Sequence, residues 1–190
     1  MQLVEKAYKK WLKDEKKYIE ISEQGDTQGL DLLIEQGEWK QCLKQASRFN
    51  PQIMNTYLMK FCIKNVKAGK YGETIAALAK YDPPLISKNF KMYNALSLRI
   101  FKRCNAKEIS YFRKFFYQQI QKFEKEQKQN TKAYRTFYRY LQCAHFINLK
   151  NLLEKQGGAF ELVTRLKISL LRYSDILRFD KLYYDAGKAC

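Results

Sequence analysis

Two stretches of the sequence share one pattern, Gly37-Glu38-Trp39-Lys40-Gln41-Cys42-Leu43 and Gly69-Lys70-Tyr71-Gly72-Glu73-Thr74-Ile75. In each stretch a glycine is followed two positions later by an aromatic residue, and then by a small and an aliphatic residue. Glycine at this place ends one helix, while the aromatic and small residues seat the next helix against it. The copies start 32 residues apart, close to the roughly 34-residue period of tetratricopeptide repeats. The pattern predicts stacked helix pairs, with two unrelated helix hairpins as the alternative.

Helical spacing of apolar residues continues along the chain, and no segment alternates apolar and polar residues over the length of a strand. The ends of the helices are marked by glycines, by prolines and by candidate N-caps. These N-caps are Asn50, Ser87, Asn105, Thr131 and Asp180. Together these signals predict helices over 3–24, 26–37, 38–49, 51–68, 70–81, 87–103, 105–123, 131–156, 160–171 and from 180 onward. The expected fold is therefore all-α, a TPR-like α-solenoid of antiparallel helix pairs with about nine or ten helices.

The domain organisation follows from the same pattern. We expect one helical-repeat segment over residues 1–190, with weak repeat units near 26–69 and 69–104 and a helix-rich remainder over 105–190. Six residues of the two copies are expected to pack the repeats against one another. These are Gly37, Trp39, Cys42, Gly69, Tyr71 and Thr74.

The formal net charge is +17, from 36 basic and 19 acidic residues. Such a field favours an acidic partner, which can be nucleic acid, an anionic membrane or an acidic protein surface. Because 27 of the basic residues are lysines, which lack the bidentate fork of arginine, sequence-specific reading of nucleic acid is disfavoured. A solvated outer face remains the alternative reading of the lysines. The candidate partner-binding residues are Lys9, Lys10, Lys13, Lys16, Lys17, Arg113, Lys114, Arg135 and Arg139.

The many aromatic residues lie at helical spacing, which is typical of buried faces. Two stripes are expected in the core. They comprise Ile109, Phe112, Phe116, Ile120 and Phe123 in one helix, and Tyr134, Phe137, Tyr138 and Leu141 in the next. Tyr111, Phe115, Tyr117 and Tyr140 fall outside these stripes, so they belong to a repeat interface or an exposed groove. A groove of tyrosines and lysines that stacks bases of RNA or single-stranded DNA is the alternative function.

The sequence carries no recognisable catalytic or cofactor-binding motif. The eight glycines form neither a P-loop nor a dinucleotide fingerprint. His145 is the only histidine, and we expect it to be a hydrogen-bonded core residue on the second stripe. It lies two positions from Cys143, on the opposite side of a helix, although a Cys-His pair between distant segments stays open. We expect no enzyme, no cofactor and no metal.

The five cysteines are odd in number and widely spaced, which fits neither a disulfide framework nor a zinc knuckle. They predict reduced thiols in an intracellular compartment. No apolar run approaches the roughly 18 residues of a membrane span, and the first residues lack the apolar core of a signal peptide.

Four short segments of the sequence resemble one family. They are Leu32-Leu33-Ile34-Glu35-Gln36-Gly37-Glu38-Trp39 with Cys42-Leu43, Asn89-Phe90-Lys91-Met92-Tyr93, Leu166-Lys167-Ile168-Ser169-Leu170-Leu171-Arg172-Tyr173, and Asp180-Lys181-Leu182-Tyr183-Tyr184-Asp185-Ala186-Gly187. They resemble the family of the largest subunit of intraflagellar transport complex B, most clearly at the two ends of the stretch 28–190.

The resemblance implies a segment of a helical-repeat tail that follows amino-terminal β-propellers, and hence a fragment of a longer chain. It also implies a non-catalytic scaffold of ciliary transport trains, which docks other subunits of complexes A and B for cilium assembly. The implied location is the cytoplasm and the cilium, at the ciliary base and axoneme. Nucleic acid is the less favoured partner under this reading.

Overall fold

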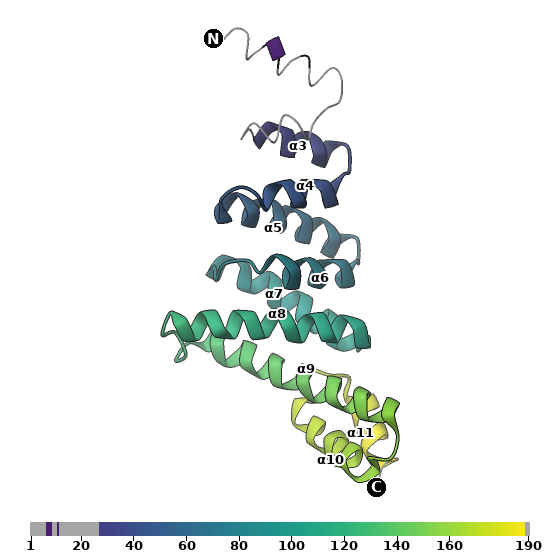
Figure 1. The fold of residues 1–190 in the computed structure, drawn as a ribbon. Coiled ribbons are helices and arrows are strands. Elements are labelled where there is room, and N and C mark those ends of the chain that lie inside the picture. Colours follow the sequence, from purple (N-terminus) through teal and green to yellow (C-terminus); the bar gives the residue numbers. More distant parts are fainter. Residues whose placement is uncertain (1–6, 9–10, 12–26, 189–190) are drawn as a thin grey trace. The chain divides into compact units, whose positions relative to one another are not determined.

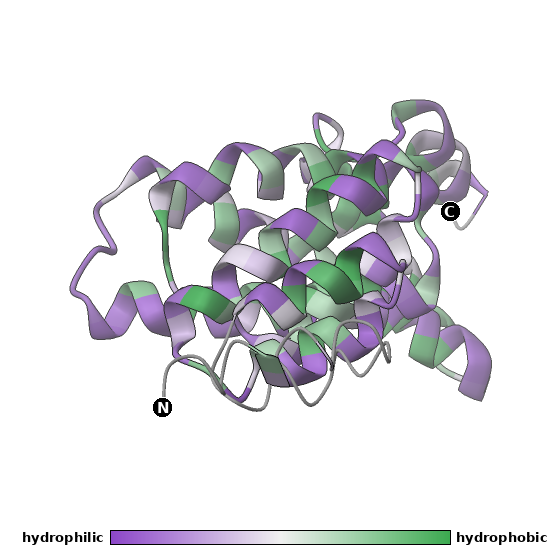
Figure 2. Ribbon diagram, turned by 90° about the horizontal axis from the view of Figure 1, so that it is seen from above, coloured by the Kyte–Doolittle hydropathy of each residue, from purple (hydrophilic) through white to green (hydrophobic). Residues whose placement is uncertain are grey.

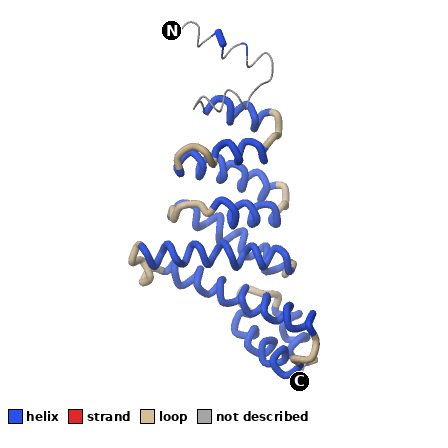
Figure 3. Tube along the Cα trace, in the orientation of Figure 1, coloured by secondary structure: helices blue, strands red, loops and turns tan. Residues whose placement is uncertain are grey.

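The computed structural model describes residues 7–8, 11 and 27–188 (Figure 1). Those residues contain helices and turns and no strand (Figure 3). The α-helices are α3 (Thr27–Glu35), α4 (Trp39–Ala46), α5 (Pro51–Lys67), α6 (Tyr71–Tyr81), α7 (Phe90–Arg103), α8 (Ala106–Lys125), α9 (Lys132–Gln156), α10 (Phe160–Leu170) and α11 (Phe179–Gly187). The predicted all-α helical-repeat fold is confirmed. The helix expected over 3–24 lies outside the described residues, apart from Ala7, Tyr8 and Trp11, which are helical.

Apolar and polar residues are interleaved along the described helices, as Figure 2 shows, which is the pattern of helices that bury one side. Among the described helices, none combines the length and the apolar character that crossing a membrane requires.

The chain divides into two compact units, Met1–Cys62 and Ile63–Cys190, with the boundary inside α5. In the first unit α3 packs against α4. The core of this unit contains Leu30, Cys42, Ala46 and Leu58, none of which has any exposed surface. The Tyr57 hydroxyl donates to Asp31 Oδ1 at 3.0 Å and so joins α5 to α3.

The second unit has an aromatic core built by α6, α7, α8 and α9. Helix α6 packs against α8, and α8 packs against α9. The largest fully buried side chains of this core are Tyr93, Phe101, Phe112, Phe115, Phe116, Phe123 and Phe137. The predicted stripe of α8 is confirmed, because Ile109, Phe112, Phe116, Ile120 and Phe123 are all buried.

The turns at Gly37 and Gly69 have the same local backbone geometry. Their φ angles are +80° and +72°, in the left-handed region that favours glycine. In both turns the amide of the following residue donates to a carbonyl five positions earlier, at 2.8 Å. Trp39 and Tyr71 then begin α4 and α6 and are half-buried. The side chains three positions later, Cys42 and Thr74, are fully buried.

A further glycine turn, at Gly158, has similar backbone angles but lacks the 2.8 Å hydrogen bond of the first two. Its φ is +81°, and Ala159 precedes α10 with φ −100° and ψ 46°, close to the φ −80° and ψ 55° of the residue that precedes α4. Phe160 stands at the aromatic position, while Val163 stands where the first two turns have Cys42 and Thr74 and is only half-buried. Here the aromatic ring is 83% exposed, whereas Trp39 packs on Phe61 with ring centroids 5.8 Å apart.

Alanine at Gly37 or Gly69 is expected to destabilise the fold by about 1–2 kcal/mol, the cost of the left-handed conformation for an L residue. A Cβ added at either position meets no atom within 4 Å, so the cost is conformational and not steric. Urea denaturation followed by circular dichroism measures it. Gly187→Ala is the matched control, because Gly187 lies in helical backbone with open space around it. An equal loss for Gly187→Ala would contradict the explanation.

Two predicted N-caps were wrong. Ser87 begins a short 3-10 turn (Ser87–Asn89), so α7 starts later and Asn89 takes the cap position. The tighter turn supplies the first backbone hydrogen bonds in place of a capping side chain. Asp180 is the second residue of α11, where its carboxylate pairs with Arg178 Nη2 at 2.6 Å. Negative charge in the first helical turn is favourable there.

The predicted caps of three other helices are confirmed. Asn50 Oδ1 accepts the Ile53 amide at 2.8 Å at the start of α5. The Asn105 side chain accepts from the first turn of α8, and Thr131 Oγ1 accepts the Tyr134 amide at 3.2 Å at the start of α9.

Candidate functional site

Helices α8 and α9 form a hairpin joined by residues 126–131, and their facing sides are held together by aromatic rings. The ring centroids of Phe116 and Phe137 are 4.9 Å apart, and those of Phe112 and Tyr140 are 6.3 Å apart. These edge-on contacts fix how the two helices present their remaining side chains.

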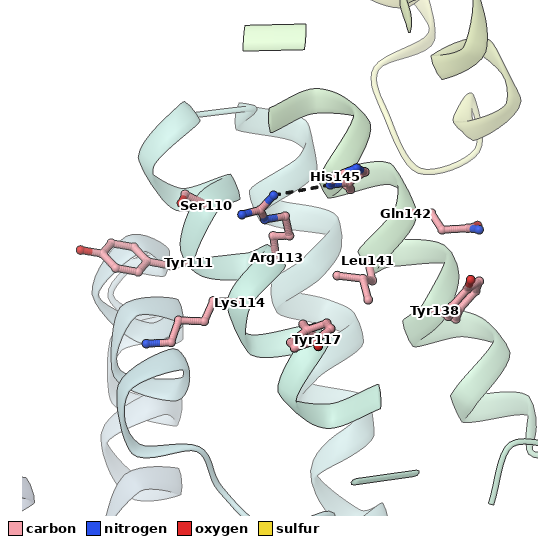
Figure 4. Close-up of a pocket in the computed structure, with 9 residues that line it drawn as sticks. All are labelled: Ser110, Tyr111, Arg113, Lys114, Tyr117, Tyr138, Leu141, Gln142 and His145. Atoms are coloured by element: carbon pink, nitrogen blue, oxygen red, sulfur yellow. Dashed lines mark hydrogen bonds between the residues drawn. The ribbon is translucent and has the colours of Figure 1, made fainter. Parts of the chain in front are cut away.

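An open cavity of about 710 Å³ lies between the outward-facing side chains of the two helices (Figure 4). We name it the Arg–Tyr groove. It is lined by Ser110, Tyr111, Arg113, Lys114, Tyr117, Tyr138, Leu141, Gln142 and His145. No lining residue is acidic, so the groove combines exposed rings with uncompensated positive charge.

The groove is bridged at one end. Arg113 from α8 and His145 from α9 point toward each other, with Nη1 and Nδ1 3.5 Å apart (Figure 4). Leu141 points toward α8, and the half-exposed ring of Tyr117 lies below it. The Tyr117 hydroxyl accepts from Gln121 Nε2 at 2.8 Å, which orients the ring. A partner can therefore contact an apolar floor and an arginine in the same place.

A second cavity of about 400 Å³ adjoins the groove and shares Tyr138 and Gln142 with it. We name it the adjoining cavity. Its other lining residues are Tyr134, Arg135, Arg139, Arg172 and Tyr173. Arg139 is anchored, since its Nη2 lies 2.7 Å from Asp175 Oδ1 and donates to the Arg172 carbonyl at 3.0 Å.

The structure brings four of the expected partner-binding residues together. Arg113 and Lys114 line the Arg–Tyr groove, and Arg135 and Arg139 line the adjoining cavity. The other five, Lys9, Lys10, Lys13, Lys16 and Lys17, lie outside the described residues. Four aromatic residues were expected at either a repeat interface or an exposed groove. Tyr111 and Tyr117 line the groove, whereas Phe115 and Tyr140 are buried.

The expected core positions of Tyr138 and His145 were wrong, since both side chains are exposed in the groove. The buried residues of α9 are Phe137, Tyr140, Cys143, Ala144 and Ile147. The buried stripe is therefore rotated around the helix from the predicted one. Tyrosines occur on both the buried and the exposed face of α9. Because a tyrosine ring packs well in a core and also at a partly solvated surface, the spacing of the aromatic residues alone did not distinguish the two faces.

The cysteines that the structure describes offer little nucleophilic chemistry. The described ones, Cys42, Cys62, Cys104 and Cys143, are free thiols. Burial raises the pKa of Cys42 to about 11 and that of Cys62 to about 12. It also raises the pKa of Cys143, whose buried thiol is separated from the exposed His145 ring. The reactive form is the thiolate, so these groups stay protonated near neutral pH. Within the described residues, no three metal-binding side chains gather.

Comparison with known proteins gives one consistent group of relatives. The chain is 24% identical over 192 residues to the intraflagellar transport protein 172 homolog of Rattus norvegicus, covering 98% of the chain. It is 26% identical over 190 residues to the homolog of Drosophila melanogaster, and 28% identical over 193 residues to intraflagellar transport protein osm-1 of Caenorhabditis elegans. The chain is related to intraflagellar transport protein 172. The resemblance found in the sequence is confirmed.

The chain spans 11% of the length of these intraflagellar transport relatives. No protein-family model and no solved structure matches it.

Proposed function

We propose that this helical-repeat segment is a non-catalytic docking module of ciliary intraflagellar transport trains. Its partners are other subunits of complexes A and B, and its place is the cytoplasm and the cilium, at the ciliary base and axoneme. The relatives support a role in this transport process, because all of them are named for intraflagellar transport. The Arg–Tyr groove supplies the surface and is the observation that carries the proposal.

The chemistry of the groove defines the partner it suits. Exposed tyrosines and arginines are the residues that contribute most at protein interfaces. The lining has two permanent cations, Arg113 and Lys114, and no carboxylate. A partner segment with apolar anchors and acidic flanks fits this surface, because the anchors bury on Leu141 and Tyr117 while the flanks meet the cations.

The test is binding of the chain to purified subunits of complexes A and B by biolayer interferometry. The variant Arg113→Glu/Lys114→Glu is expected to lower the affinity for its partner at least about tenfold, because it places like charges against an acidic segment. Lys88→Glu/Lys91→Glu is the control, since it changes the charge equally at exposed positions outside the groove. Absence of binding to every subunit, or equal loss in the control, would refute the proposal.

Binding of RNA or single-stranded DNA is the second candidate. It is favoured by Tyr111 and Tyr117, which are exposed beside Arg113 and Lys114. The rings of Tyr134 and Tyr138 stack on each other, with centroids 5.8 Å apart, so the faces between them are not open to a base. Retention of a labelled oligonucleotide that falls steeply with salt would favour this candidate, because each neutralised phosphate releases counterions.

A further inference from the structure

A third cavity, of about 210 Å³, lies where the end of α7 meets α9, α10 and α11. We name it the basic pocket. Six cationic side chains line it: Lys102, Arg103, Lys150, Lys167, Arg178 and Lys181. Asp185 is the only acidic residue of the lining. The cations come from elements far apart in the sequence, so the fold gathers them into one place.

The carboxylates around the basic pocket only partly balance this charge. Glu154 is shared by two lysines, with Oε1 3.3 Å from Lys167 Nζ and Oε2 3.8 Å from Lys150 Nζ. Lys102 and Lys181 make no ion pair within the part of the chain that the structure describes. Two exposed ammonium groups therefore remain available to a bound anion.

Burial strengthens the field inside the basic pocket. The side chains of Lys150 and Lys167 are only 17% and 24% exposed, so solvent screens them less than surface lysines. Buried apolar side chains, Ile147, Leu170 and Leu177, form part of the wall and hold water away. Charge interactions are stronger in such surroundings than in bulk water.

Cys104 lines the basic pocket together with Lys150 and Lys181. Burial raises its pKa, while the nearby Lys181 and Lys150 act to lower it and Asp185 acts to raise it. The residue closes α7 in the left-handed conformation, with φ +49°, and so turns the chain where the pocket begins. Both lysines thus lie near one half-buried thiol, as convergent ligands of an anion would.

The cavity size and charge point to one ligand class. Pockets for drug-sized ligands occupy roughly 300–1,000 Å³, and this one is smaller, so it suits a compact group. Ammonium and guanidinium groups are the usual partners of phosphate. We infer that the basic pocket binds a compact polyphosphate group, carried by a soluble inositol phosphate or by the headgroup of a phosphoinositide lipid. This site is separate from the Arg–Tyr groove and independent of the proposed docking function.

Isothermal titration calorimetry of the full chain with inositol trisphosphate tests the proposal. Saturable one-site binding is expected, accompanied by a rise in the melting temperature of the chain. Lys102→Met/Lys181→Met is expected to weaken binding at least about tenfold, through lost charge-assisted hydrogen bonds. Both lysines are exposed, and circular dichroism checks that the variant folds.

Lys88→Met/Lys91→Met is the matched control, because it removes the same charge at exposed positions of the same unit. It should change the affinity less than about twofold, since these lysines lie outside the pocket lining. No saturable binding by the unmodified chain, or an equal loss in both variants, overturns the proposal.

A vesicle experiment separates the two sources of the phosphate group. Phosphatidylcholine vesicles carrying phosphatidylinositol bisphosphate are compared with vesicles carrying phosphatidylserine at matched surface charge. Retention on the first only, competed by inositol trisphosphate, identifies the lipid headgroup as a ligand. Binding of soluble inositol trisphosphate without vesicle retention identifies the free inositol phosphate.

Discussion

Phe137→Ala is expected to lower the free energy of unfolding by about 3–5 kcal/mol, the range for removing a fully buried phenylalanine ring. Phe137 has no exposed surface and sits where three helices of the second unit meet. Its ring centroid lies 5.1 Å from that of Phe90 in α7 and 4.9 Å from that of Phe116 in α8. The ring of Phe123 lies 5.9 Å away. Alanine would leave a cavity that these edge-on rings cannot close without losing their own contacts.

Urea denaturation followed by circular dichroism measures the loss. Tyr138→Ala is the matched control, since it removes a ring of similar size from the next position of α9, where the side chain is exposed in the groove. Its expected cost is below about 1 kcal/mol. Similar costs for both variants would contradict the assignment of the two faces.

Tryptophan fluorescence adds a second readout of the Phe137→Ala variant. Both tryptophans, Trp11 and Trp39, lie in the unit Met1–Cys62. If the two units unfold independently, the fluorescence transition should stay in place while the dichroism transition moves. If the variant shifts both transitions, the units unfold together.

The helix positions could be predicted from the sequence because their signals are local. Asn105 caps α8 with its own side chain, and Gly69 ends α5 through its own backbone freedom. Such features depend on a few neighbouring residues and not on what packs around them. The turn at Gly158 carries only part of this signal. Phe160 follows it by two positions, but Val163 and Thr164 replace the small and aliphatic pair, and Gly158 follows Gly69 by 89 residues, which is no multiple of the 32-residue spacing of the first two.

The faces of the helices were harder to predict, because they depend on tertiary contacts. Helix α9 has aromatic residues around much of its circumference, and only the packing of Phe137 and Tyr140 on α8 decides which are buried. The basic pocket shows the same limit. Lys102, Lys150 and Lys181 lie in three different helices, and no spacing along the chain connects them.

The end of α6 also depends on a tertiary contact, with Lys122 of α8, that cannot be predicted from the sequence. The Asp82-Pro83-Pro84 stretch predicts a helix stop, and Asp82 ends the helix in the left-handed conformation with φ +44°. Lys122, from α8, holds this turn. Its Nζ pairs with Asp82 Oδ1 at 2.5 Å, and it donates to the carbonyls of Asp82 at 3.0 Å and Pro83 at 2.7 Å. One ammonium group thus satisfies three acceptors of a turn that has left the helix.

Lys122→Met is therefore expected to destabilise the second unit by about 2–3 kcal/mol, because hydrogen bonds to charged groups contribute roughly 1.5–3 kcal/mol and the Asp82 carboxylate and carbonyl lose this donor. The Pro83 carbonyl keeps a second donor, Gln119 Nε2 at 3.1 Å. Methionine keeps the aliphatic stem, so the loss isolates the ammonium group. Lys125→Met, an exposed change on the same helix, should stay within about 0.5 kcal/mol in the same urea titration. If Lys122→Met proved equally silent, water and Gln119 would be adequate partners for the Asp82 and Pro83 carbonyls, and the Lys122 ammonium would not stabilise the end of α6.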